Sequence, residues 1–314
     1  MNPEKTIWMD GQFVPWDKAQ VHVMTHSLHY GSAVFEGIRS YVTPTGVAIF
    51  RLHDHLRRLF DSARIYGLEI DYSLHELRSV CHQLLTVNGL DSAYFRPLVY
   101  LGGGQLSPVG DQCKVHVSIA AIRLGAYLGE DGLANGIDVG VSSWQRVAPN
   151  TVPTGAKATG NYLTSRLVGR EARRHGYAEG LVLSADGLLS EGAAENLFLV
   201  RDGVIFTPGD SDSILGGITR HSVIELARAA GLEVRQQSLP REWLYTADEI
   251  FLTGTAAEVT PVRSVDRTAV GSGKPGPVTR QLSAQFMGLF SGQTTDSWGW
   301  LDHVEVCHDH KIAV

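Results

Sequence analysis

The sequence is poor in cysteine, and the cysteines it has follow no structural pattern. Its 314 residues include three cysteines, at positions 81, 113 and 307. Their number is odd and their spacing is wide, so they form neither a disulfide framework nor a CxxC metal site. Because disulfides are rare in reducing compartments, this usage favours a cytoplasmic protein.

Long apolar runs and charged runs are also missing. No segment approaches the roughly 18 apolar residues of a membrane span, and the N-terminus lacks a signal-peptide layout. The net charge of -6 is mild and no basic stripe stands out, which argues against a nucleic-acid partner. The histidines have no cysteine or carboxylate at a recognised ligand spacing, so we expect no metal site.

What remains is the composition of an ordinary globular protein. Hydrophobic residues make up 43% of the chain and charged residues 19%, which is typical of a soluble domain. The length allows one large domain or two modest ones, each with a sizeable core.

The first part of the chain predicts hairpins and two helices. Asp10-Gly11, between apolar segments at 6–9 and 12–15, is a strong hairpin signal. Apolar residues at helical spacing, at 52–63 and 74–85, predict two helices, the first with Gly67 as its stop and the second ending near Asn88-Gly89. The further predicted strands are 38–41, 47–51, 94–101 and 115–122.

The segment 125–136 is rich in glycine and has no period, so we interpret it as the connection between two domains, 1–124 and 137–314. Beyond it the sequence predicts helices over 161–175 and 219–230, with strands at 137–142 and between 181 and 207. Both halves mix hairpins and helices without regular alternation. This predicts two α+β domains rather than a doubly wound parallel sheet.

Lys157 stands in the stretch Pro153-Thr-Gly-Ala-Lys-Ala-Thr-Gly-Asn-Tyr-Leu163, among small residues and without a nearby acid. Such neighbours allow a planar ring to lie against the backbone, and a lysine with a lowered pKa can form a Schiff base. An exposed loop lysine is the plain alternative. A P-loop is excluded, because Ala156 and Ala158 stand where GxxxxGK[ST] requires glycine and a hydroxyl residue.

Three other segments could bind parts of one ligand. Gly216-Gly217 lead into a helix with Thr219 in its first turn, which makes a phosphate seat, and Arg58 could add a charged fork. Glu191 lies among small residues before an apolar strand, where a carboxylate needs a cationic partner. The strand and turn at 251–257 could also receive an anion. Each segment has a plain structural explanation, but together they describe pyridoxal phosphate.

The chain resembles the class-IV aminotransferases, which have fold type IV. The family pattern matches at Glu191, Ala193, Asn196, Leu197, Phe198, Thr207, Leu215, Gly217, Ile218 and Arg220. Other stretches are similar to bacterial branched-chain amino acid aminotransferases: 29–39, 93–97, 143–149, 157–163 and 298–301. The resemblance covers roughly residues 6–304.

The resemblance implies a site between two domains, with Lys157 as the Schiff-base lysine and proton shuttle. It implies that the cofactor is bound by Arg58, Lys157, Tyr162, Glu191, Gly217, Ile218, Thr219 and Thr255. It implies that amino acids and 2-oxo acids are bound by Tyr30, Phe35, Arg39, Tyr94, Arg96, Tyr127, Thr255 and Ala256. Tyr30 would come from a neighbouring subunit, so a homo-oligomer is implied, either a dimer or a trimer of dimers.

The implied reaction is a ping-pong transfer of the amino group from L-leucine, L-isoleucine or L-valine to 2-oxoglutarate. Arg96 at the rim would receive the side-chain carboxylate of glutamate, beside an apolar pocket. Two positions depart from the family, because Leu124 replaces a pocket tryptophan and Arg123 lies beside it. The departure implies a wider or reshaped pocket, which could admit aromatic or unusual amines.

Other functions stay open. Within the same fold they are a D-amino acid aminotransferase, an (R)-amine aminotransferase and an aminodeoxychorismate lyase. From another class, the chain could be a catalytically silent cofactor-binding protein or a phosphate-binding module.

Overall fold

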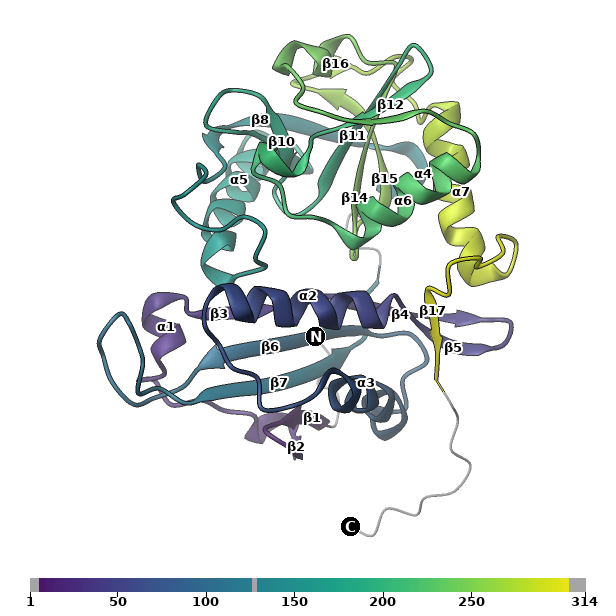
Figure 1. The fold of residues 1–314 in the computed structure, drawn as a ribbon. Coiled ribbons are helices and arrows are strands. Elements are labelled where there is room, and N and C mark those ends of the chain that lie inside the picture. Colours follow the sequence, from purple (N-terminus) through teal and green to yellow (C-terminus); the bar gives the residue numbers. More distant parts are fainter. Residues whose placement is uncertain (1–5, 126–128, 305–314) are drawn as a thin grey trace.

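The protein, in a computed structural model that describes residues 6–125 and 129–304, consists of two bodies, each built on its own β-sheet (Figure 1). The N-terminal sheet forms the lower body in Figure 1, with helix α2 running along the side that faces the upper body. The observed mixture of hairpins and helices confirms the predicted α+β class.

The first sheet has the strand order β17-β5-β4-β6-β7-β1-β2, with β3 also paired to β6. Its elements are β1 (Thr6–Met9), β2 (Gln12–Pro15), α1 (His26–Tyr30), β3 (Ala33–Phe35), β4 (Ile38–Thr43), β5 (Gly46–Phe50), α2 (Leu52–Ile65), α3 (Leu74–Asn88), β6 (Tyr94–Leu101), β7 (Val115–Ile122) and β17 (Leu301–His303). Every strand pair in it is antiparallel.

Helices α2 and α3 form where the apolar spacing predicts them. Each buries a leucine-rich face against the sheet, in a core that includes Leu56, Leu77 and Phe95. Helix α3 starts at a capping box, in which Ser73 and Glu76 satisfy each other's free backbone N–H groups. Both helices end where the sequence predicts, α2 at Ile65 shortly before Gly67 and α3 at Asn88 with Gly89 as its C-cap.

The second sheet has the order β10-β9-β8-β15-β14-β11-β12-β13, and β16 pairs with β15. Its strands are β8 (Ile137–Gln145), β9 (Glu179–Leu183), β10 (Leu189–Gly192), β11 (Asn196–Arg201), β12 (Val204–Thr207), β13 (Val234–Gln236), β14 (Glu249–Gly254), β15 (Glu258–Val265) and β16 (Thr268–Ala269). An additional pairing between β10 and β11 closes the strands from β10 to β11 into a barrel, whose apolar lining includes Val139, Leu197 and Leu252.

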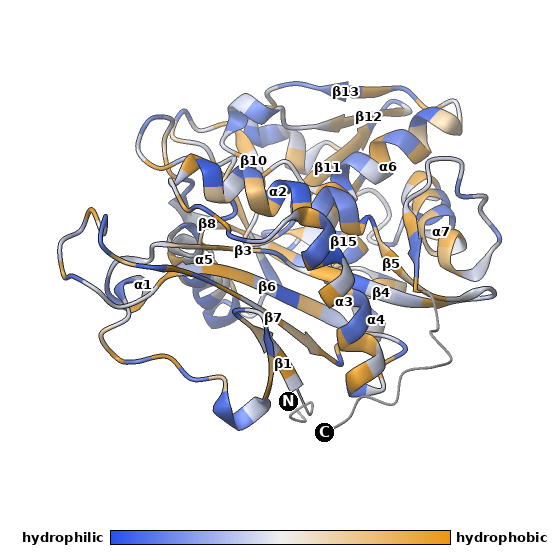
Figure 2. Ribbon diagram, turned by 60° about the horizontal axis from the view of Figure 1, so that its bottom comes forward, coloured by the Kyte–Doolittle hydropathy of each residue, from blue (hydrophilic) through white to orange (hydrophobic). Residues whose placement is uncertain are grey.

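Helices cover this barrel on its outside (Figure 1). They are α4 (Glu130–Asn135), α5 (Tyr162–Arg174), α6 (Ile218–Ala229) and α7 (Pro277–Ser291). Short 3-10 helices occur at Trp16–Lys18, directly after β2 of the first sheet, and later in the chain at Thr159–Asn161, Asp210–Asp212 and Arg241–Tyr245. In Figure 2, hydrophobic residues run along the strands of both sheets, while the helices carry hydrophobic and hydrophilic residues together. The described part of the chain contains no helix long and apolar enough to span a membrane.

One apolar cluster joins the two bodies. Tyr41 of β4 stacks on Phe290 of α7 with ring centroids 3.6 Å apart, and Phe50 meets Phe286 edge to face. Past α7 the chain returns to the first sheet, where β17 pairs with β5. This cluster closes one side of the junction between the two sheets.

The predicted helices and the first hairpin are present, and three helices were not predicted. Helix α4 lies inside 125–136, where the sequence analysis expected an irregular connection. The short helix α1 and the fifteen-residue helix α7 are further additions. Helix α7 has Pro277 at its start and Gly292 in a left-handed conformation at its end, which are ordinary helix boundary signals.

Candidate active site

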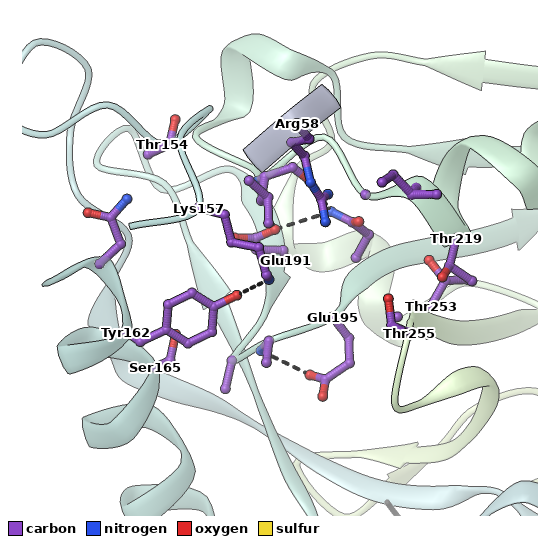
Figure 3. A pocket seen from close by; sticks show the side chains of 18 of the residues that line it. Arg58, Thr154, Lys157, Tyr162, Ser165, Glu191, Glu195, Thr219, Thr253 and Thr255 are labelled. Atoms are coloured by element: carbon purple, nitrogen blue, oxygen red, sulfur yellow. Dashed lines mark hydrogen bonds between the residues drawn. The ribbon is translucent and has the colours of Figure 1, made fainter. Parts of the chain in front are cut away.

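Two adjoining cavities lie where the two bodies meet. The smaller, of about 60 Å³, is lined by residues from α2, α6 and the segment before α5. The larger, of about 430 Å³, is lined by residues from β3, β6 and α5. Lys157, Tyr162 and Thr255 line both cavities, and Figure 3 shows them among the residues of the smaller one. The two cavities therefore meet at Lys157.

Backbone contacts hold Lys157 in place. Its N–H donates to Ser62 of α2, and its carbonyl accepts from Phe35 of β3. The Asn161 side chain donates to two carbonyls of the preceding loop, at Pro153 and Ala156. The small residues around Lys157 thus let the loop pack closely against the first sheet, and the lysine does not stand on an exposed loop.

The Lys157 amine is buried and has a lowered pKa. Its Nζ donates to the Tyr162 hydroxyl at 2.5 Å and lies over the Phe35 ring. Burial and the nearby positive charge of Arg58 lower the pKa of Lys157 from 10.5 to about 8. An amine with such a pKa exchanges protons near neutral pH, as a catalytic lysine must.

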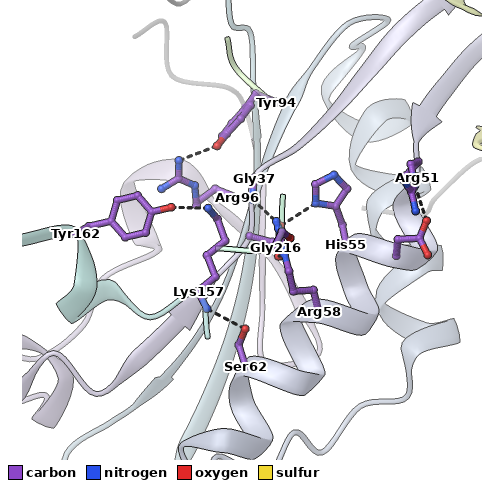
Figure 4. A network of polar contacts seen from close by, with 12 residues as sticks. Gly37, Arg51, His55, Arg58, Ser62, Tyr94, Arg96, Lys157, Tyr162 and Gly216 are labelled. Atoms are coloured by element: carbon purple, nitrogen blue, oxygen red, sulfur yellow. Dashed lines mark hydrogen bonds and ion pairs between the residues drawn. The ribbon is translucent and has the colours of Figure 1, made fainter. Parts of the chain in front are cut away.

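Arg58 belongs to a buried charge network shown in Figure 4. Its Nε and Nη2 donate to the two oxygens of Glu36 at 2.6 and 3.0 Å, and Nη1 donates to the Gly216 carbonyl. His55 contacts the same carboxylate at 2.8 Å. Burial alone would raise the pKa of Glu36, but Arg58 and His55 hold it well below its usual range. Glu36 thus keeps its charge and fixes Arg58 at the cavity wall.

The N-terminus of α6 faces the same cavity. The helix starts at Ile218 after Gly217, and no side chain caps its first turn within the described residues. Ile218 and Thr219 line the cavity together with Arg58. Free N–H groups, the helix dipole and an arginine together can bind a phosphate group.

Glu191 also lines the smaller cavity and is buried. Its Oε1 is 2.7 Å from Nη2 of Arg146, and its Oε2 accepts from Asn196 and from the Leu215 backbone N–H. Burial raises the pKa of Glu191, and the Arg146 charge opposes that shift. The predicted need for a cationic partner is met by Arg146, which the sequence analysis did not foresee.

The larger cavity combines aromatic walls with one arginine of the first sheet. The rings of Phe35 and Tyr162 pack edge to face at 4.8 Å. The Arg96 guanidinium lies over Phe35 and donates to the Tyr94 hydroxyl at 3.0 Å. A Cβ at Gly37 would lie 2.0 Å from that hydroxyl, so only glycine leaves room for Tyr94.

The turn after β14 completes the walls. Thr255 and Ala256 line the larger cavity, and Thr253 lines the smaller one with a buried hydroxyl that has no hydrogen-bond partner among the described groups. Glu195, also on the wall, is close to the buried Glu179. Burial and the Glu179 charge raise the pKa of Glu195 well above its usual range.

The residues predicted to bind the cofactor all line the smaller cavity. Of the residues predicted to bind the substrate, the larger cavity is lined by Phe35, Tyr94, Arg96, Thr255 and Ala256. The fold thus brings together these predicted residues, which are distant from one another in the chain.

Other predicted residues lie elsewhere. Arg39 is 3.1 Å from Glu258 and lies over Tyr41, and it lines neither cavity. The exposed Tyr30 donates to the Leu106 carbonyl, away from both cavities of its own chain. Tyr127 falls outside the described residues.

The two positions that depart from the family also lie off the described cavity walls. Arg123 is 3.7 Å from Asp91 and donates to the Gly89 carbonyl. Neither Arg123 nor Leu124 is among the described residues that line the two cavities.

Several residues of this site were not predicted from the sequence, namely Glu36, His55, Ser62, Arg146, Glu195 and Thr253. Glu36 stands inside the quoted stretch 29–39, and an acid within an apolar strand region is a signal for a buried ion pair. Arg146 and Thr253 also stand in stretches considered above, at 143–149 and 251–257, but their roles depend on what surrounds them in the fold. His55 and Ser62 contact residues far away in the chain, at Glu36 and Lys157, so no local pattern marks them.

Comparisons with known proteins agree with this geometry. Residues 33–265 match the family Amino-transferase class IV. The branched-chain-amino-acid aminotransferase of Escherichia coli (strain K12) is 55% identical over 301 residues, which cover 95% of this chain and 97% of that one. The enzyme of the same name from Pseudomonas aeruginosa is 45% identical over 294 residues, covering 94% and 95%.

Solved structures are similar over the same extent. The crystal structure of the Escherichia coli branched-chain amino acid aminotransferase superimposes with a TM-score of 0.94 at 53% identity, covering 96% of this chain and 99% of that one. The branched-chain amino acid aminotransferase from Thermobaculum terrenum, in its PLP-form, gives 0.88 at 35% identity, covering 96% and 98%. This chain therefore belongs to the class IV aminotransferase family.

Proposed function

We propose that this protein reversibly transfers the amino group from L-leucine, L-isoleucine or L-valine to 2-oxoglutarate, with pyridoxal 5'-phosphate as cofactor. The main support is the position of Lys157, whose buried amine stands where a charged cavity and an aromatic cavity meet. The names of the similar enzymes support the same substrates.

The residues present fit the cofactor. The helix start beside Arg58 suits a phosphate ester, and the unpartnered Thr253 hydroxyl is a buried donor without a protein acceptor in the described structure. Glu191 suits a ring nitrogen, and Tyr162 suits a phenolic oxygen. We propose that Arg58, Gly217, Ile218, Thr219 and Thr255 hold the phosphate, and that Lys157 holds the aldehyde carbon.

Bound pyridoxal phosphate withdraws electrons from the Cα of the substrate and carries the amino group between the two half-reactions. The chain supplies the proton transfers. Because the pKa of Lys157 is about 8, its amine can take a proton from Cα and return it on the other side of the reaction. Tyr162 orients that amine through its hydrogen bond.

The larger cavity accounts for two kinds of side chain. We propose that the α-carboxylate is bound by the Tyr94 hydroxyl and the backbone N–H groups of Thr255 and Ala256. Phe35 and Tyr162 provide the apolar surface for leucine, isoleucine or valine. We propose that Arg96 binds the second carboxylate of glutamate, and its position over Phe35 at 4.8 Å supports this role.

We further propose a cytoplasmic homo-oligomer. Large apolar side chains are exposed together on two neighbouring segments around Tyr30, at Val21, Val23, Leu28, Leu106 and Val109. An apolar surface of this kind is typical of a subunit interface, and Tyr30 on it would reach the active site of a second copy. The buried Cys81 and Cys113 thiols are free, as in a reducing compartment.

We also propose that the domains divide at residues 1–124 and 137–314, with 125–136 as the connection. The two sheets support this division, and the pairing of β17 with β5 returns the end of the second part to the first sheet.

An amino-donor panel tests the proposed function. Purified protein loaded with pyridoxal phosphate is given L-leucine, L-isoleucine or L-valine with 2-oxoglutarate, and glutamate formation is measured. D-alanine, an (R)-amine and aminodeoxychorismate serve as competing substrates for the alternative activities of this fold. We expect the L-branched donors to exceed all others, and a preference for D-alanine or the (R)-amine would overturn the proposal.

A further inference from the structure

One face of helix α5 forms a continuous wall of the larger cavity. Its residues recur at intervals of three and four, which places them along one side of a helix. They are Tyr162, Ser165, Arg166, Gly169, Arg170 and Arg173. The wall therefore runs from the tyrosine beside Lys157 to the far end of the helix.

Three arginines, which we call the arginine row, stand on this wall: Arg166, Arg170 and Arg173. With a rise of 1.5 Å per residue, they lie about 6, 12 and 16 Å along the helix axis from Tyr162. The row thus extends outward from the reacting end of the cavity.

The arginine row has little compensating charge. Within the described residues no carboxylate forms an ion pair with Arg166 or Arg170, while Arg173 faces the buried Glu179. Burial raises the pKa of Glu179, so this carboxyl is a weak counter-charge. In a protein whose net charge is -6, three cations in one cavity form a local positive field.

General features of helices explain only part of the row. A helix dipole favours cations in the last turn, which accounts for Arg173 and for Arg174 beside it. Arg166 lies in the first half of α5, where the dipole gives no such advantage. A solvated helix face would be expected to carry acidic residues as well, at spacings that pair with the arginines.

Gly169 keeps the wall open between Arg166 and Arg170. A Cβ at this position would meet nothing within 4 Å, so the glycine does not serve close packing. Glycine inside a helix is destabilising relative to alanine, because it loses more backbone freedom on folding. Its position on the cavity wall leaves space for a ligand chain to pass the two arginines.

We propose that the arginine row binds the distal anionic group of amino acid and 2-oxo acid substrates that are longer than glutamate. This inference rests on the proposed function, in which the reacting carbon lies at Lys157 and Arg96 takes the shorter glutamate side chain. A distal carboxylate that extends past Arg96 along α5 meets Arg166 and then Arg170, with charge-assisted hydrogen bonds available from both. The substrate range thus includes long dicarboxylic amino acids such as 2-aminoadipate.

A binding experiment with unreactive acids isolates the distal group. Adipate and hexanoate have the same chain length and differ by the second carboxylate. Their dissociation constants are measured by calorimetry on the cofactor-loaded wild type and on the double variant Arg166→Gln/Arg170→Gln. We expect the double variant to lose about tenfold in adipate affinity, which is a typical effect of removing partly exposed charge-assisted contacts, and to bind hexanoate about equally.

Arg174→Gln is the matched control, because it removes the same charge from the last turn of α5 without lining a described cavity. We expect this variant to bind both acids like the wild type. If Arg174→Gln and the double variant lost adipate affinity equally, the effect would come from the overall charge of the helix, and the inference would be overturned.

Half-reaction kinetics complete the test. L-leucine, L-glutamate or 2-aminoadipate is mixed with the cofactor-loaded protein without a 2-oxo acid acceptor, and the change in cofactor absorbance is measured. We expect the double variant to lower kcat/KM for 2-aminoadipate about tenfold and to affect leucine much less. A wild type that converts leucine but neither binds adipate more tightly than hexanoate nor accepts 2-aminoadipate would overturn the inference alone. A wild type that converts none of the three donors would overturn the proposed function.

Discussion

The charged side chains of the smaller, inner cavity are paired with opposite charges, whereas those at the outer end of the larger cavity are mostly unpaired. At the inner end, Arg58 is paired with Glu36 and Glu191 is paired with Arg146, all within hydrogen-bond distance. At the outer end, the arginine row on α5 is exposed and largely without carboxylate partners in the described residues. The inner charges are neutralised before any ligand arrives, and the outer charges are not.

The difference indicates two kinds of ligand. Buried charges are costly unless they are paired and hydrogen-bonded, so an inner wall built of pairs keeps its geometry with or without a ligand. Such a wall suits a group that stays bound, as a cofactor does. An exposed charge can stay unpaired at little cost in free energy, because water solvates it. Such a wall suits substrates that enter and leave in every reaction cycle.

The largest expected effect is at the junction of the two ends. Replacing Lys157 with alanine removes both the attachment point of the cofactor and the proton carrier, so amino transfer from leucine should fall by at least about 10⁴-fold. Lys274→Ala, at an exposed lysine, is the control and should retain full activity. Wild-type turnover by the Lys157 variant would contradict the assignment of the site.

Next in size is the loss of the inner carboxylate. Glu36→Gln leaves Arg58 buried without its counter-charge, which costs about 3–5 kcal/mol in comparable buried pairs. We expect a loss of this order in the free energy of unfolding in urea, together with weaker binding of pyridoxal phosphate. The exposed pair of Glu233 with Arg235 offers a matched control, since Glu233→Gln should cost about 0–1 kcal/mol.

The free energy of unfolding at low pH should depend on the same charge network. The pKa of Glu36 in the folded protein lies below its ordinary value of 4.5, so its contribution is fully present above that pH and is lost as the pH falls further. Unfolding measured below pH 4.5 should therefore be steeper in pH for the wild type than for Glu36→Gln. Equal slopes for the two proteins would show that Glu36 is not ionised in the fold.

A smaller effect is expected where the first sheet meets the substrate. In Gly37→Ala the new methyl group would collide with the Tyr94 hydroxyl, 2.0 Å from the Cβ position. Overpacking of this kind costs about 1–3 kcal/mol, so we expect KM for leucine to rise about tenfold while cofactor binding stays unchanged. Gly209→Ala is the control, because Gly209 lines neither cavity and its Cβ would come no closer than 3.7 Å to any neighbour. A normal KM in Gly37→Ala would place the substrate away from Tyr94.

The smallest effect is the pH dependence of cofactor uptake. With a pKa of about 8, the Lys157 amine is mostly protonated at pH 7 and mostly free at pH 9, so the rate of attachment should rise up to about tenfold between them. Stopped-flow absorbance on the apoprotein measures this rate, with a free lysine derivative as the reference for an ordinary pKa of 10.5. A midpoint near that of the reference would mean that Lys157 is not buried.

Much of the fold could be predicted where one element carries its own signal. The leucine spacing of α2 and α3 and the Asp10-Gly11 turn act within a few residues, and the structure confirms them. Helix α7 shows the limit, since its composition is nearly uncharged and its apolar face is defined by contact with the rings of Tyr41 and Phe50 from the other body. Helix α4 and strand β17 likewise depend on partners that no local pattern names.

The sequence by itself determined the chemistry that this chain offers, because the lysine, the carboxylate and the glycine-led helix start are local features that can be compared with a family. The tertiary structure alone decided how those groups behave. Arg58 contacts Glu36, which lies 22 positions away in the chain, and Arg146, which follows β8, contacts Glu191 of β10. The ionisation of these groups therefore depends on distances that folding sets. The physical reason is that a pKa and a cavity wall are properties of what surrounds a side chain in space, and those surroundings come from several distant segments at once.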